Sequence, residues 1–342
     1  MRFGLFGGAK SAGTGPDADS HGYQSFIDYV LRAEALGFES LFMVEHHFTG
    51  VGQVSASLNL LTYLAARTTR IRLGTAVIVL PWHNPALLAE QAATLDLLSG
   101  GRFDFGIGKG YRKAEFDSFC IDQSEAEARF QECLDFLRKA WSEPERFSHH
   151  GRFWDYENIV VEPRPIQRPH PPFWMAAGSV ESIRRAAREG FNLLLDQLAP
   201  SDLSLERAQI FRDALEEFGR DRNSSKIALA RSLQLAETRA ERDAALAVRR
   251  RVLSRIGDLA RGRGAERYAD IASVSDEELA KDDSTLIGMP DDIIPRLQKL
   301  SDGGIDTVLL IDPNGDPRSL KIFASEIAPM VDGAAQIAEN VS

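Results

Sequence analysis

Short apolar runs alternate with amphipathic stretches along most of the chain. In the amphipathic stretches hydrophobic residues recur every three to four positions, a spacing that predicts helices, as at Phe26, Ile27, Val30 and Leu31. The apolar runs predict buried strands at 2–6, 40–44, 71–80, 102–107, 173–176, 191–195, 227–236 and 307–311. Strands and helices in strict alternation with short links predict a parallel α/β sheet, and the count of eight predicts closure into a (β/α)8 TIM barrel. We expect a single domain over residues 1–342.

Two stretches depart from this alternation and predict insertions after the fourth and the seventh strand. Residues 145–172 are rich in proline with an aromatic centre, which predicts an excursion containing a short hairpin. Residues 238–285 are a long charged insertion, arginine-rich at first and acidic at the end. Such charge runs usually form solvated helical faces, so a plain pair of surface helices is one interpretation. Gly262 and Gly264 favour a second interpretation, a hinged lid over the strand ends at 261–285.

The charge of the chain argues against two classes of partner. A formal net charge of −10 and a pI near 5.3 disfavour nucleic acid and anionic membrane surfaces. Cys120 and Cys133 have the spacing of neither a metal motif nor a redox pair, which suits a reducing compartment. The first apolar run is too short for a signal peptide, and no run has the length of a membrane helix. We therefore expect a cytoplasmic protein.

Glu45, His46 and His47 directly follow the second predicted strand. In barrels of parallel strands the active site lies at the carboxyl ends of the strands, where these three side chains are expected. Adjacent residues of an extended chain point in opposite directions, so we expect one of the two imidazoles to face the interior. Taken alone, the dipeptide is equally compatible with two loop histidines whose hydrogen bonds are satisfied.

Two loops after neighbouring strands have the composition of phosphate sites. The segment Gly106-Ile107-Gly108-Lys109-Gly110 follows the fourth strand, and its glycines let a ligand approach the backbone beside a lysine. Ser179 follows the fifth strand and opens a helix, whose N-terminal N–H groups can bind an anion. A structural turn and a simple N-cap explain each loop by itself. The two loops together favour phosphate binding.

Other polar residues are assigned to structure. Asp96 and Arg102 lie before the fourth strand, on the barrel face that serves stability, and we expect them to form an ion pair. No spaced ligand motif accompanies His46, so no metal site is expected.

The motifs of the chain, taken together, resemble those of the bacterial luciferase-like flavin-dependent monooxygenases. The motifs that carry the resemblance are Gly37-Phe38, Glu45-His46-His47-Phe48, Gly74-Thr75-Ala76-Val77-Ile78-Val79-Leu80-Pro81, Asn84-Pro85, Leu95-Asp96, Ser99-Gly100-Gly101-Arg102-Phe103, Gly106-Ile107-Gly108-Lys109-Gly110, Pro171-Pro172-Phe173-Trp174, Ala236-Glu237-Thr238, Gly288-Met289-Pro290 and Gly304-Ile305-Asp306. Their combination is specific to the family and covers almost the whole chain.

The resemblance implies a barrel that binds reduced FMN (FMNH2) at the carboxyl ends of its strands. A separate flavin reductase would supply the reduced flavin, which would react with O2 to a C4a-hydroperoxide. That species would oxygenate a small organic substrate, either by attack on a carbonyl or by hydroxylation. The aromatic residues Phe6, Trp82, Tyr111 and Trp174 suggest a mostly apolar substrate, although aromatic residues are common in barrel cores. We also expect a homodimer through the helices that follow strands two and three.

The resemblance also implies roles for single residues. His46 matches the catalytic histidine, and an imidazole can take or return the proton of a peroxide near neutral pH. Ala76 and Val77 match a strand-three pair whose non-proline cis peptide cradles the flavin ring. The other positions that match flavin and phosphate contacts are Gly108, Lys109, Arg129, Gly178, Ser179 and Ser182.

Three of these positions depart from the luciferase pattern. Lys109 replaces an arginine, which keeps the charge but loses the planar fork of the guanidinium. Gly108 replaces a cysteine beside the flavin, and Gly178 replaces a glutamate of the phosphate loop. Light emission is therefore not implied.

Three other functions are compatible with the same barrel. A deazaflavin-dependent hydride-transfer enzyme is the nearest, but such enzymes tend to carry an Asp-His pair where this chain has Glu45-His46-His47. A non-catalytic flavin-binding subunit is disfavoured because His46 is retained. A metal hydrolase is disfavoured because the ligand set is missing.

Overall fold

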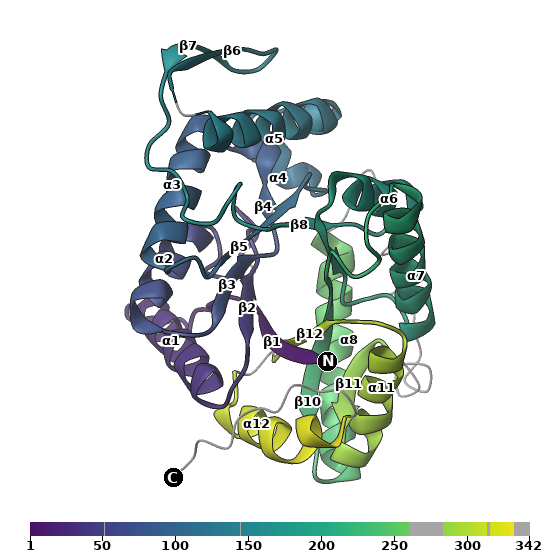
Figure 1. The fold of residues 1–342 in the computed structure, drawn as a ribbon. Helices are drawn as coiled ribbons and strands as arrows, with labels where there is room; N and C mark the ends of the chain where they lie inside the picture. Colours follow the sequence, from purple (N-terminus) through teal and green to yellow (C-terminus); the bar gives the residue numbers. More distant parts are fainter. Residues whose placement is uncertain (51, 144, 260–282, 313–314, 332–342) are drawn as a thin grey trace.

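The computed structural model describes residues 1–50, 52–143, 145–259, 283–312 and 315–331. Eight parallel strands of these residues close into a barrel (Figure 1). The barrel strands are β1 (Arg2–Gly7), β2 (Ser40–Met43), β3 (Arg72–Thr75), β5 (Phe103–Gly108), β8 (Phe173–Ala176), β9 (Asn192–Leu195), β10 (Ile227–Leu235) and β12 (Thr307–Ile311). The ring closes because β12 pairs with β1 on one side and β10 on the other, while β10 also pairs with β9. The predicted (β/α)8 barrel is confirmed.

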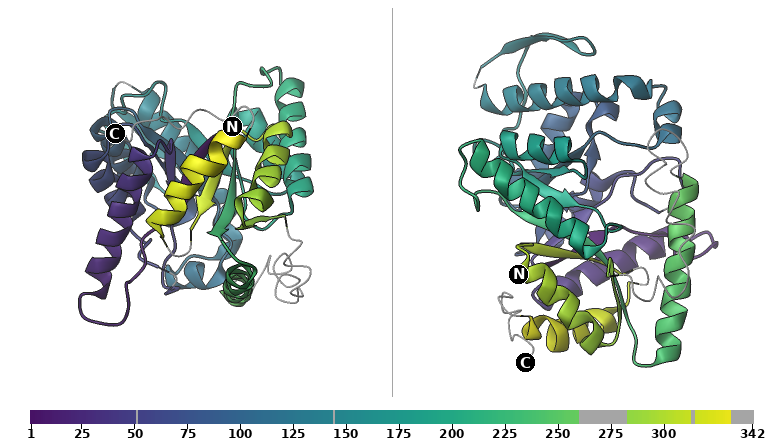
Figure 2. Two further views of the ribbon diagram at one scale, coloured as in Figure 1. Left: turned by 90° about the horizontal axis from the view of Figure 1, so that it is seen from below. Right: turned by 90° about the vertical axis from the view of Figure 1, so that its right-hand side faces the viewer.

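Helices cover the outside of the barrel (Figures 1 and 2). They are α1 (Ala18–Ala35), α2 (Ser57–Arg67), α3 (Pro85–Leu98), α5 (Ala126–Ser142), α6 (Val180–Glu189), α7 (Ser201–Glu217), α11 (Pro290–Asp302) and α12 (Pro317–Ile322). Each buries apolar side chains, as α5 does with Phe130, Leu134 and Leu137. None of the helices in the described parts of the chain has the length and apolar character needed to cross a membrane.

A small cluster of apolar side chains, separate from the main core between the strands and the helices, fills the barrel interior. It consists of Phe42, Trp174, Leu194, Ala228 and Leu309. The rings of Phe42 and Trp174 meet edge to face with their centroids 5.2 Å apart. Leu194 lies on a cavity at the carboxyl ends of the strands, whereas Phe42 and Trp174 line a smaller one at the amino end. The cluster therefore separates the two ends of the barrel.

The third strand differs from its prediction. The apolar run at 71–80 predicted one strand, but the structure has β3 followed by a separate β4 (Ile78–Val79). The peptide between Ala76 and Val77, which lies at the break, is cis, as the family resemblance implied.

Glycines of the neighbouring strand β5 make room for this break. A Cβ on Gly106 would lie 1.6 Å from the Thr75 carbonyl oxygen, and one on Gly108 would lie 2.4 Å from Val77 Cγ2. The Thr75 hydroxyl also donates to the Gly106 carbonyl at 2.7 Å. Part of the glycine pattern of strand four thus serves close backbone packing.

The first insertion is the predicted hairpin, formed by β6 (Phe147–His150) and β7 (Asp155–Ile159), which projects beyond α5 in Figure 1. Its turn is attached to α5 by Glu132, whose carboxylate accepts hydrogen bonds from the backbone N–H groups of Arg152, Phe153 and Trp154.

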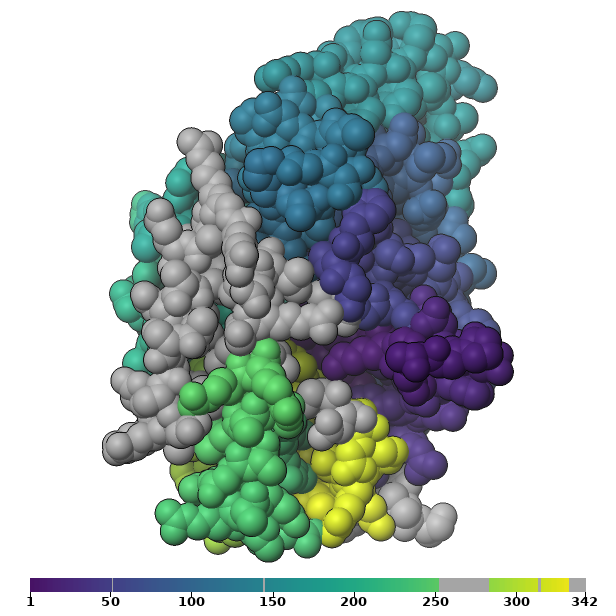
Figure 3. Space-filling view, turned by 180° about the vertical axis from the view of Figure 1, so that it is seen from behind, coloured from purple at the N-terminus to yellow at the C-terminus, as the bar shows by residue number. Residues whose placement is uncertain are grey.

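The second insertion begins with α8 (Arg239–Leu259), a long helix that stands apart from the other helices (Figure 2) and is exposed on the face drawn in Figure 3. It ends with β11 (Thr285–Gly288), a strand that was not predicted and that pairs with the carboxyl-terminal half of β10. The lid predicted at 261–285 falls largely on residues 260–282, which lie outside the described residues, and stays a prediction.

Short helical segments complete the described chain. They are η1 (Leu80–Trp82), α4 (Lys113–Ser118), η2 (Gln123–Glu125), η4 (Phe323–Ile327) and η5 (Ala328–Met330).

The ion pair predicted between Asp96 and Arg102 is wrong. The Arg102 guanidinium instead donates to the carbonyl oxygens of Ala65, Thr68 and Ile71, at the end of α2 and beyond it. Carbonyls at a helix end lack partners within the helix, so they compete well for a guanidinium. Asp96 accepts hydrogen bonds from the backbone and side-chain amides of Gln167. Both residues are structural, but with separate partners.

Candidate active site

A cavity of about 1680 Å³ lies at the carboxyl ends of the barrel strands. Its walls come from the ends of the strands and the loops that follow them, from α5 and α6, and from α8 through Val248 and Arg249. Pockets for one drug-sized ligand measure about 300–1,000 Å³, so this cavity has room for a cofactor together with a substrate.

His46 lies on the wall of this cavity, in the loop after β2. Its Nδ1 is 3.1 Å from Glu115 Oε1. Glu115 is buried on α4, and the same oxygen accepts the backbone N–H of His47 at 2.9 Å. A carboxylate at Nδ1 favours the tautomer with the hydrogen on that atom, which leaves Nε2 as the acceptor for a ligand.

Glu45 organises the other two histidines of the site. Its Oε1 lies 2.8 Å from His83 Nε2 and 3.2 Å from His47 Nε2, and its Oε2 accepts the Val79 N–H at 2.7 Å. Burial alone would raise the pKa of the Glu45 carboxyl. The charge on His83 and these hydrogen bonds outweigh burial and lower that pKa to about 2. Glu45 is therefore ionised and ties the ends of the second and third strands together.

His47 is turned away from the cavity. Its ring packs edge to face against Trp82, at 5.7 Å between centroids, and against Phe119, at 4.9 Å. His46 and His47 thus lie on opposite sides of the chain, as the alternation of an extended segment predicts.

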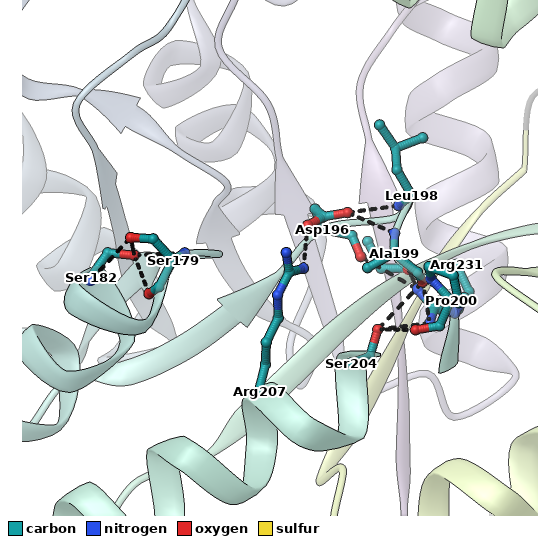
Figure 4. A network of polar contacts seen from close by, with 10 residues as sticks. Ser179, Ser182, Asp196, Leu198, Ala199, Pro200, Ser204, Arg207 and Arg231 are labelled. Atoms are coloured by element: carbon teal, nitrogen blue, oxygen red, sulfur yellow. Dashed lines mark hydrogen bonds and ion pairs between the residues drawn. The ribbon is translucent and has the colours of Figure 1, made fainter. Parts of the chain in front are cut away.

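The two predicted phosphate loops lie side by side because their strands, β5 and β8, are paired. Ser179 caps α6 with its hydroxyl on the Ser182 N–H, and the Ser182 hydroxyl accepts the Ser179 N–H in return (Figure 4). Both hydroxyls belong to residues of the cavity wall, together with Gly178. The N-cap interpretation is confirmed, and it leaves the N-terminus of α6 open to a ligand.

Lys109 and Arg185 share one carboxylate at the edge of these loops. Lys109 Nζ is 2.8 Å from Glu127 Oε2, and Arg185 Nη1 is 2.5 Å from Glu127 Oε1. The two cations lower the pKa of the Glu127 carboxyl against the effect of its partial burial. All three residues line the cavity. Arg185 was missed from the sequence, although it follows Ser182 by three positions and so shares its helical face.

Arg129 does not lie on this cavity, contrary to the expectation from the resemblance. Its Nε is 3.0 Å from Glu125 Oε2, and its guanidinium carbon is 4.3 Å from the centre of the Phe153 ring. Arg129 therefore belongs to the attachment of the hairpin on α5.

The remaining predicted positions are divided between the cavity and the core. Ala76, Val77 and Gly108 line the cavity, as do Phe6, Trp82 and Tyr111. Trp174 lies in the barrel interior instead. Among the described residues, no group of three or more His, Cys, Asp and Glu side chains is arranged to hold a metal ion.

The loop after β9 forms a wall of the cavity that the sequence did not reveal. Asp196 accepts the N–H groups of Leu198 and Ala199, and the buried Arg231 of β10 donates to the Ala199 carbonyl at 3.0 Å and to Ser204 Oγ at 3.1 Å (Figure 4). These side-chain contacts fix a loop whose backbone is outside the helices and strands.

A closed (β/α)8 barrel with histidine–carboxylate pairs on a cavity at its strand ends is the architecture of an enzyme. The family model of the luciferase-like monooxygenases matches residues 1–307, and the chain belongs to this family.

Two curated relatives illustrate the match. The oxygenase component of the flavin-dependent trigonelline monooxygenase of Acinetobacter baylyi is 27% identical over 83% of this chain and 81% of its own length. The uncharacterized protein y4vJ of Sinorhizobium fredii is 36% identical over 63% of this chain, and the match spans 61% of that relative.

Solved structures agree on the fold. Monooxygenase RslO1 from Streptomyces bottropensis superposes with a TM-score of 0.81 at 27% identity, covering 96% of this chain and 99% of its own. Two further structures show the same fold at lower identity. The oxygenating constituent of 3,6-diketocamphane monooxygenase from Pseudomonas putida, in complex with FMN, has a TM-score of 0.76 at 20% identity, over 96% and 98% of the two chains. An F420-dependent secondary alcohol dehydrogenase has a TM-score of 0.77 at 16% identity, over 97% and 99%.

Proposed function

We propose that the protein is the oxygenase component of a two-component monooxygenase. It takes reduced FMN from a separate flavin reductase and consumes O2, placing one oxygen atom in a small organic substrate and releasing the other as water. The observation that carries this proposal is His46, which Glu115 holds on the cavity wall at the strand ends with Nε2 left for a ligand. The named oxygenase component among the relatives supports the same class.

The cavity fits reduced FMN. Lys109, Arg185, Ser179 and Ser182 supply two cations and two hydroxyls for its phosphate, beside the N-terminus of α6. Ala76, Val77 and Gly108 form the wall proposed for the ring. Reduced flavin supplies the two electrons that activate O2.

The residues of this chain supply the proton and the environment. His46 Nε2 accepts or returns a proton at the cavity wall, and Glu115 keeps the ring in the orientation that this needs. Glu45 fixes the adjoining loop through His83 and Val79 N–H. Phe6 and Trp82 present apolar surface to the cavity and reduce the access of water.

Reaction of the protein with reduced FMN and with reduced F420 tests this proposal. We expect the protein to delay the return of the absorbance of oxidised FMN on mixing with O2, compared with free reduced FMN. With ¹⁸O2 and a substrate, one labelled oxygen atom should enter the product. Oxidation of FMN at the rate of free solution, together with oxidation of bound reduced F420 by a carbonyl compound, would establish the hydride-transfer function instead.

We further propose a cytoplasmic homodimer formed through α2 and α3. These two helices carry exposed apolar side chains at Tyr63, Leu87, Leu97 and Leu98, the pattern of a surface that a partner covers. Both cysteines are free thiols, which suits the reducing compartment in which reduced flavin is supplied.

A further inference from the structure

We propose that Arg112 binds an anionic oxygen group of the substrate, so that the substrate is a small organic carboxylate with an apolar body. The proposal rests on the monooxygenase function for the role of the cavity and adds the chemical class of what enters it.

Arg112 is a buried cation that finds no acceptor for two of its nitrogens among the described residues. Its side chain is only 5% exposed, and it lines the cavity. Its Nε and Nη1 are both buried and have no hydrogen-bond partner in the structure as described. Its guanidinium carbon lies 5.5 Å from the centre of the Tyr111 ring. Buried donors of a charged group are costly to leave unpaired, so a ligand that supplies acceptors gains an unusually large advantage at this position.

Three other cations of the cavity wall have polar partners within the chain. Lys109 and Arg185 share Glu127, and Arg249 donates to the side-chain and backbone oxygens of Gln197. The acid closest to Arg112 in sequence is Glu115, whose Oε1 is taken by His46 and by the His47 N–H. Among the described ion pairs none includes Arg112, and two of its guanidinium nitrogens, Nε and Nη1, are buried without a hydrogen-bond partner in the described residues.

Arg112 stands at the start of the helix that positions His46. It is the N-cap residue of α4, and Glu115 follows three positions later, so the two lie on neighbouring positions of one helical face. A carboxylate bound at Arg112 therefore places the rest of the substrate near the helix that holds the histidine. The planar fork of a guanidinium matches the two oxygens of a carboxylate, which suits this pairing.

Trp82 provides a second unsatisfied donor in the same neighbourhood. Its Nε1 is buried without a partner in the described residues, and its ring packs against Phe116 of α4, 5.5 Å between centroids. Aromatic walls at Trp82 and Tyr111 suit an apolar body behind the carboxylate. Lys109 and Arg185 lie beside the N-terminus of α6, where the phosphate of FMN is proposed to bind, and the proposal assigns Arg112 to the substrate.

Calorimetric titration of the full-length, FMN-loaded protein tests the proposal with two matched pairs of probes. These are benzoate with benzamide, and octanoate with octanamide. We expect at least one carboxylate to bind more tightly than its amide by about 10- to 100-fold, the value of a charge-assisted hydrogen-bonded pair. Arg112→Met should abolish this preference, Arg112→Lys should retain part of it, and both should bind FMN with an affinity within about twofold of the parent.

Thermal melting without a probe tests separately whether Arg112 has a structural role. Since Arg112 forms no ion pair with the described residues, Arg112→Met should melt at the same temperature as the parent or higher, whereas a structural arginine would give a lower one. If Arg112→Met does not fold, Arg112→Gln takes its place in both measurements. The proposal is overturned if neither carboxylate binds, if amides bind equally well, if the preference survives in the Met variant, or if that variant loses FMN affinity. Failure of the proposed function would show separately, as FMN oxidation unaffected by the protein in an assay that contains no carboxylate.

Discussion

At the scale of single residues, two adjacent histidines have acquired different surroundings. His46 faces the cavity with Nδ1 on Glu115, and His47 points the other way, between Glu45 and the rings of Trp82 and Phe119. The difference follows from the alternation of an extended chain, and it predicts that the two imidazoles cannot replace each other.

Replacing His46 with Ala should separate proton handling from flavin binding. We expect FMN affinity to stay within about twofold, and coupled oxygenation to fall by about 10²–10⁴-fold, the usual value of a general acid–base group. Reducing equivalents should then leave as peroxide, which is measured per FMNH2 oxidised. His47→Ala is the matched control and should change this ratio much less. An unchanged ratio of product to peroxide in His46→Ala would rule out the proton role.

Lys109 and Arg185, the two cations near α6, should contribute to flavin binding only through the phosphate of FMN. Lys109→Ala and Arg185→Ala should each weaken FMN binding by about tenfold, because each removes one charge-assisted contact to the phosphate. Riboflavin, which lacks the phosphate, should bind both variants as it binds the parent. Arg129→Ala serves as the control, since Arg129 is held by Glu125 and Phe153. Fluorescence quenching measures all of these, and equal losses for riboflavin and FMN would argue against a phosphate contact.

Some residues of this site could be predicted from the sequence, and others could not. His46 and Lys109 were found because each follows a recognisable strand, and Ala76 was found through the family resemblance. Glu115 was missed because α4 is six residues long and has no clear apolar period. Its contact with His46 spans 69 positions of sequence, and such pairings are set by how loops pack at a barrel mouth.

At the scale of elements, periodicity placed the strands and helices but not their interruptions. The run at 71–80 is mostly apolar and rich in β-branched residues, so its hydrophobic pattern does not mark the break at Ala76 and Val77. Gly106 and Gly108, on the neighbouring strand, leave the space that the break occupies. β11 was also missed because its pairing depends on another strand. It pairs with β10 only in the part of β10 that extends beyond β9.

The exposed apolar face of α2 and α3 leads to a prediction on assembly. Leu98 of α3 is 62% exposed, and Leu98→Lys should convert a dimer into a monomer by placing a charge in the interface. Leu203 of α7 is 39% exposed and gives a matched control, because Leu203→Lys should leave the dimer intact. Light scattering coupled to size-exclusion chromatography reports both masses. A monomeric parent protein would refute the interface.

At the scale of the whole molecule, Glu45 links the carboxyl ends of consecutive strands. Its two oxygens join the loop after β2 to Val79 of β4 and to His83, just after η1. At this end of the barrel the buried charge network adds to the strand pairing of β4 with β5. Acid should therefore weaken the fold by acting on this network.

The pH dependence of stability follows from the pKa of Glu45. In the folded chain this pKa is about 2, below the ordinary 4.5, so unfolded molecules bind the proton more readily. The stabilisation is complete above about pH 4.5 and is lost as the pH falls towards 2, with a total on the order of 3 kcal/mol. Urea unfolding from pH 7 to pH 2.5 should show this loss. Glu45→Gln should be less stable at pH 7 and should vary less with pH, so that the two curves converge in acid. Glu39→Gln, which removes an exposed partner of Arg2, should follow the parent curve at every pH. Parallel curves for Glu45→Gln and the parent would show that the pKa of the Glu45 carboxyl is not lowered in the folded chain.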